Sequence, residues 1–147
     1  LIPLLALLSL VLVVKRGWRA TLGPWVVLLG MAALALTVVA AGSGEELQAN
    51  VRDTALVRHH AELGSAMRPI AFAQFVALLL LVAPAWAYRR GGPGVLARMA
   101  QLRLLSILAV VLVVATAALA SYWIVQTGHS GAESVWHGVK MVNHGED

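Results

Sequence analysis

The residues His59-His60-Ala61-Glu62-Leu63-Gly64 form a short polar segment between two long apolar runs. Its two histidines and its glutamate are ionisable groups in a chain of 147 residues, of which 60% are hydrophobic and only 12% are charged. A soluble domain of this size lacks the interior volume to bury so much hydrocarbon. The sequence therefore predicts an all-α integral membrane protein, with the polar segment near the end of a membrane helix.

Four apolar runs predict a single membrane domain that covers residues 1–147 and consists of a four-transmembrane-helix bundle. The helices are expected at about 1–14, 24–41, 54–88 with a kink near residue 69, and 104–125, followed by a polar tail at 126–147. The first run rises only about 21 Å at ~1.5 Å per residue, against a hydrocarbon core of ~30 Å. We therefore expect the covered sequence to start partway through its first helix.

The basic residues predict the orientation, because lysine and arginine concentrate in cytoplasmic connections. The connections after the first and third runs carry seven of them, against three in the connection after the second. The seven are Lys15, Arg16, Arg19, Arg89, Arg90, Arg98 and Arg103, and the three are Arg52, Arg58 and Arg68. Both chain ends, all five histidines and the polar segment are then expected on the outer side of the membrane.

His60 is the leading candidate for a cofactor ligand. It lies one helical turn before Gly64, so both share a face, and the small residue leaves room for a flat macrocycle. A histidine near a helix end suits axial ligation of a haem b. The alternative is an interfacial histidine that bonds to water or to Glu45. His59 points about 100° away and is expected to be solvated.

His129 and Glu133 form a second candidate pair, because a spacing of four residues places both on one face of a helix. A histidine and a carboxylate can serve zinc or iron. Gly128 and Gly131, however, favour a turn over a helix. The candidate cofactor residues are His60, His129 and Gly64, and the candidate metal ligands are His60, His129, Glu133 and Glu45.

Several function classes are disfavoured. The chain contains no cysteine, which removes disulfides, thiolate metal sites and cysteine nucleophiles. No serine, histidine and aspartate set suggests a nucleophilic triad, so the sequence leans towards a protein that is not an enzyme. Residues 24–42, 70–88 and 104–125 carry no charge, unlike most transporters and pumps. The net charge of +4 is spread over connections, not gathered on a face that binds nucleic acid.

The polar segments resemble recurring elements of a known family. Ser43-Gly44-Glu45, His60-Ala61-Glu62-Leu63-Gly64 and Gly128-His129-Ser130-Gly131-Ala132-Glu133-Ser134-Val135-Trp136 are similar to segments of a bacterial four-helix membrane family, catalogued as domain of unknown function 2231, especially its actinobacterial members. The family typically has further histidines at the outer start of its first helix, before the point where this sequence begins. Some members are fused to Rieske or cytochrome-like domains, so the resemblance implies an association with electron transfer.

Two functions follow as hypotheses. The first is a redox-associated membrane protein that holds haem or a metal ion at the outer leaflet through His60 and His129. The second is a non-catalytic accessory subunit that packs against other membrane protein subunits and holds no cofactor. Small residues of the second and fourth runs would provide its contact surface. They are Gly30, Ala32, Ala33, Ala117, Ala118 and Ala120.

Overall fold

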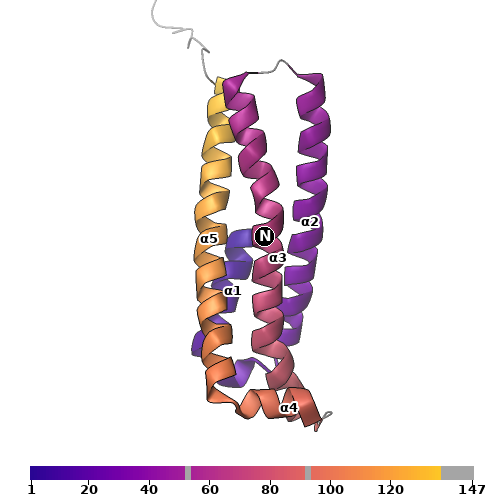
Figure 1. Cartoon of the computed structure of the whole chain (residues 1–147), viewed down its shortest axis with the longest axis vertical. Helices are drawn as coiled ribbons and strands as arrows, with labels where there is room; N and C mark the ends of the chain where they lie inside the picture. The colour runs from indigo at the N-terminus through magenta and orange to yellow at the C-terminus, as the bar shows by residue number, and fades with distance from the viewer. Residues whose placement is uncertain (52–53, 92–93, 137–147) are drawn as a thin grey trace, which may run out of the picture.

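The described part of the chain is helical and contains no strand (Figure 1). The computed structural model describes residues 1–51, 54–91 and 94–136. The helices are α1 (Ile2–Val14), α2 (Gly23–Asn50), α3 (Ala55–Arg89), α4 (Gly94–Gln101) and α5 (Arg103–Trp136), with one 3₁₀ turn, η1 (Arg16–Trp18), between α1 and α2.

Three of these helices, α2, α3 and α5, are long and apolar enough to cross a membrane. Helix α1 is apolar but has 13 residues. Large aliphatic side chains cover the outside of the bundle: Leu28 of α2 is 50% exposed and Val111 of α5 is 55% exposed. Such a surface is unfavourable in water and favourable in hydrocarbon. The protein is therefore a helical membrane protein, as the composition predicts.

Helix α3 lies between α2 and α5, and α1 packs beside the half of the bundle that is nearer α4 (Figure 1). The largest fully buried side chains in the described part of the chain are Leu12, Leu78, Val113 and Ser9. Gly30 lets α2 approach α3 closely, because a Cβ at this position would lie 3.3 Å from Leu78 Cδ2. Small residues at such crossings let membrane helices gain dispersion contacts.

The two ends of the bundle differ in chemistry (Figure 1). At the polar end, the last turns of α5 lie beside the first turns of α3, and α2 ends at the same end of the bundle. The basic end is formed by the connection at residues 15–22, the last turn of α3, and α4. Helix α4 crosses this end of the bundle. The basic end contains all seven lysines and arginines of the first and third connections. It contains no acidic residue, because no aspartate or glutamate occurs within residues 1–44 or 63–132.

Two helices are longer than predicted. Helix α2 continues from residue 41 to Asn50, and α5 continues from residue 125 to Trp136. The predicted turn at Gly128 and Gly131 is therefore wrong. A glycine inside a helix costs only about 1 kcal/mol relative to alanine, which flanking helix formers and packing offset. The rest of the predicted polar tail, residues 137–147, lies outside the described residues.

Helix α3 begins close to the predicted position and continues through both of its prolines, Pro69 and Pro84. Thr54 caps its start, because the Thr54 side-chain oxygen accepts a hydrogen bond from the Val57 backbone N–H at 3.2 Å. This cap places His60 in the second turn of α3, at the polar end, where the neighbouring helix is the last part of α5.

Candidate functional site

The candidate site is centred on a hydrogen bond between α3 and α5. His60 Nδ1 lies 3.0 Å from Ser130 Oγ, and Ser130 is 6% exposed. The Ser130 hydroxyl in turn donates to the backbone carbonyl of Thr127 at 3.0 Å. The two polar segments of the sequence therefore meet, and their meeting point is Ser130.

This pattern relates the Ser130 hydroxyl to the tautomer of His60. A serine hydroxyl has one proton, and when that proton is donated to the Thr127 carbonyl, Ser130 Oγ accepts from His60. In that arrangement His60 Nδ1 is the donor. In the neutral imidazole the other nitrogen, Nε2, then carries a free lone pair, which is the group that a histidine uses when it ligates a metal ion.

Gly131 lets the His60 ring lie directly against α5. A Cβ at position 131 would lie 3.0 Å from His60 Cε1 and 3.3 Å from Nδ1. Nine in ten real Cβ contacts are longer than such distances, so a larger residue would push the ring away from Ser130. Gly131 thus helps to position His60, although the sequence alone predicts a turn at this glycine.

The other predicted ligands do not join His60. His129 precedes Ser130 on α5, but its side chain is exposed, as is that of Glu133. The helical conformation of α5 does place His129 and Glu133 one turn apart, as their spacing requires. Within the described residues, no group of three or more histidine, cysteine, aspartate or glutamate side chains is arranged to hold a metal ion.

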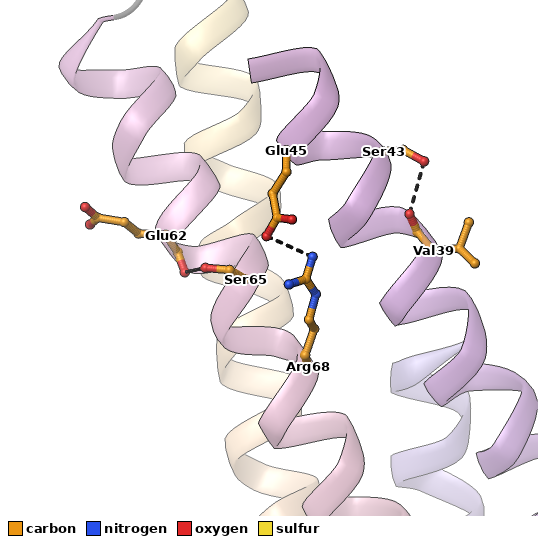
Figure 2. Close-up of polar contacts among 6 residues, drawn as sticks. All are labelled: Val39, Ser43, Glu45, Glu62, Ser65 and Arg68. Carbon is orange, nitrogen blue, oxygen red and sulfur yellow. Dashed lines mark hydrogen bonds and ion pairs between the residues drawn. The ribbon is translucent and has the colours of Figure 1, made fainter. Parts of the chain in front are cut away.

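Glu45 pairs with Arg68 and not with His60 (Figure 2). Arg68 Nη2 lies 2.8 Å from Glu45 Oε1, and this ion pair connects α2 to α3 at the polar end. The Glu62 carboxylate points away from the pair, while the Glu62 backbone carbonyl accepts from Ser65 Oγ at 3.0 Å (Figure 2). The proposed alternative partner of His60, Glu45, is therefore engaged elsewhere.

Gly64 has open space beside it, which is the property that makes it a candidate neighbour of a flat macrocycle. It is half-buried, and a Cβ at this position would meet nothing within 4 Å. Since Gly64 lies on α3 one turn after His60, there is open space on that side of the helix.

Sequence reasoning missed a buried polar cluster at Gln74, which is 3% exposed. Gln74 Nε2 donates to Ser9 Oγ of α1 at 3.2 Å, and Thr116 Oγ1 of α5 donates to Gln74 Oε1. Ser9 also donates to the Leu5 carbonyl of its own helix at 2.7 Å. The cluster connects three helices within the apolar zone. The available signal was the single side-chain amide in the third apolar run, because such groups usually face other helices.

Comparison with known proteins supplies no relative: no family model matches the chain, and neither the curated proteins nor the solved structures contain a significant match.

Proposed function

We propose that the protein is a four-span protein of the bacterial plasma membrane that is associated with electron transfer, with His60 ligating haem through Nε2. The observation that carries this proposal is the hydrogen bond between His60 Nδ1 and Ser130 Oγ. Ligating histidines generally donate their second N–H to a nearby acceptor, which fixes the ring orientation and the tautomer. The Ser130 hydroxyl fulfils that role for His60.

The residues at the polar end fit a haem better than a bare metal ion. A structural metal ion needs three or four protein ligands, and the described residues bring no such set together. A haem needs only one or two axial ligands, and His60 supplies one. The open space beside Gly64 lies one turn away on the same helix. Bound haem would supply one-electron chemistry, while the chain would orient His60 and exclude water.

The topology is part of the proposal. Seven basic residues at the basic end, against three in the connection at the polar end, support a cytoplasmic basic end and extracytoplasmic chain ends. Helix α1 packs against α2 and α5 and would be the first of the four spans. The resemblance to domain of unknown function 2231 supports the same arrangement, with the histidines outside.

The His60→Ala variant is expected to abolish the haem absorption of the purified protein, because it removes the axial ligand. Ser130→Ala should retain absorption but weaken haem affinity by about 10–100-fold, since it removes only the group that orients the ring. The measurement is the optical spectrum in the oxidised and reduced states, with haem titrated into each variant.

The matched control is His59→Ala, which removes the exposed neighbouring histidine and should leave the spectrum unchanged. If wild-type protein shows no Soret band in either redox state, or if His60→Ala retains the wild-type spectrum, His60 is not a haem ligand.

The second candidate is an accessory subunit without a cofactor. Two contacts at the polar end favour it, because the His60–Ser130 bond and the Glu45–Arg68 pair tie helices together in the manner of purely structural groups. The small residues cited for partner contact support it less. Four of them, Gly30, Ala33, Ala117 and Ala120, are buried within the chain. Purification in mild detergent separates the candidates, since an accessory subunit co-purifies with its complex and shows no haem spectrum.

A further inference from the structure

A cavity at the basic end lies outside the site described above. It has a volume of about 220 Å³, is open on one side, and is lined by residues of α3, α4 and α5 together with Arg19. Most of its walls are aliphatic, and the polar groups among its lining residues are Arg19 and Ser106. Leu80 and Leu108 line the cavity and are 42% and 48% exposed, so the cavity borders the lipid-facing surface of the bundle.

Arg19 is a cation that the fold holds away from bulk solvent. It is 6% exposed, and its Nε and Nη2 donate to the backbone carbonyls of Leu12 and Val13, each at 2.9 Å. These bonds cap the end of α1, but carbonyl dipoles do not neutralise a full positive charge. Burial lowers the pKa of the Arg19 guanidinium, and the positive charge of Arg16 lowers it further. The group nevertheless stays charged at neutral pH.

The chain supplies no anion at this end. No carboxylate pairs with Arg19 in the part of the chain that the structure describes, and residues 1–44 and 63–132 contain none. The other cations of the basic end add to the positive field. One of them, Arg90, lies over the Trp86 ring at 4.5 Å from the ring centre and has an aromatic partner, whereas Arg19 has no partner of opposite charge among the described residues. A buried charge is costly unless it is paired, so a cavity next to this unpaired cation is suited to an anion.

The volume of the cavity limits which kind of anionic molecule it can hold. Its 220 Å³ is smaller than the ~300–1,000 Å³ pockets that enclose drug-sized ligands. The cavity has room for a small anionic group or for part of a larger molecule whose remainder stays in the bilayer. Aliphatic walls next to one guanidinium match a charged headgroup that is joined to hydrocarbon.

We propose that this cavity binds an anionic phospholipid, with the headgroup phosphate at Arg19 and the start of an acyl chain between α3 and α5. The lipid neutralises a cation that the chain leaves without a carboxylate. It also fills the space between α4 and the spanning helices. Basic pockets between membrane helices are suited to this class of ligand.

Native mass spectrometry of the whole chain tests the proposal, with phosphatidylglycerol and phosphatidylcholine titrated into separate samples. These lipids share a phosphodiester but differ in net charge. We expect one phosphatidylglycerol to be retained per chain, and phosphatidylcholine to bind at least about tenfold more weakly, because its choline cation offsets the phosphate charge and is repelled by the other cations of the basic end. Inorganic phosphate should not be retained, because it lacks the apolar part.

Three variants locate the site. Arg19→Gln should weaken phosphatidylglycerol binding by about tenfold or more, whereas Arg16→Gln, which removes an exposed charge at the same end, should not. Ala85→Leu fills the cavity without altering Arg19 and should also abolish retention. Equal binding of the two lipids would contradict the proposal, as would equal effects of Arg16→Gln and Arg19→Gln. If Arg19→Gln fails to fold, unchanged phosphatidylglycerol retention in Ala85→Leu contradicts it.

Discussion

The Leu78→Ala variant is expected to lose about 2 kcal/mol or more of the free energy of unfolding, within the ~2–5 kcal/mol range for such core substitutions. Leu78 has no exposed surface and belongs to the core that joins α1, α2, α3 and α5. In a bilayer the unfolded helices are surrounded by hydrocarbon, so the transfer contribution is small and the cost comes from lost packing. We therefore expect a value near the lower end of the range.

The measurement is reversible unfolding in mixed micelles with increasing denaturing detergent, followed by circular dichroism. Leu28→Ala is the matched control, because it makes the same chemical change at a leucine that is 50% exposed to lipid. Equal losses for the two variants would mean that Leu78 does not lie in a packed interior.

The Gly23→Ala variant is expected to destabilise the protein by about 1–3 kcal/mol, the usual cost of overpacking a core. A Cβ at position 23 would lie 2.6 Å from Val82 Cγ1 and 3.0 Å from Cγ2. Val82 is 3% exposed and branched at Cβ, so its side chain cannot turn aside. The added methyl group must push α2 away from α3 near the basic end.

A double-mutant cycle identifies this clash. Val82→Ala removes both methyl groups, so Gly23→Ala should cost less in the Val82→Ala background, with a coupling energy of about 0.5–3 kcal/mol. Gly44→Ala is the control within the same helix, because a Cβ there meets nothing within 4 Å. It should leave stability unchanged or raise it by up to about 1 kcal/mol. A Gly23→Ala variant that behaves like Gly44→Ala would contradict the close contact between α2 and α3.

The sequence predicts the helical membrane class well, because long uncharged apolar runs are typical of membrane-spanning helices. It predicts helix ends poorly. At residues 42–44 and 128–131, glycines weaken the helix by amounts that side-chain bonds and packing can offset, so the breaks expected there do not occur. Ser43 illustrates this, since its hydroxyl donates to the Val39 carbonyl at 3.0 Å within the continuing helix (Figure 2).

The sequence also does not predict which face of each helix packs against its neighbours. Helices α2 and α5 are apolar all round, so periodicity does not show which side faces a neighbour. The candidate site shows the consequence. His60 was identified from its place at a helix end, but its expected neighbours were His129 and Glu45. One residue corresponds to about 100° of helix rotation, and that rotation makes Ser130 the inward residue and leaves His129 outside.

The most direct test of the account is the tautomer of His60, measured by nitrogen-15 NMR of histidine-labelled protein without cofactor, at a pH where the imidazole is neutral. His60→Ala identifies the His60 resonances. The account predicts a proton on Nδ1 and a free lone pair on Nε2, and it predicts that Ser130→Ala removes this bias while His59→Ala does not. A His60 ring protonated on Nε2 would contradict the account, because the nitrogen proposed as the ligand would then carry the proton.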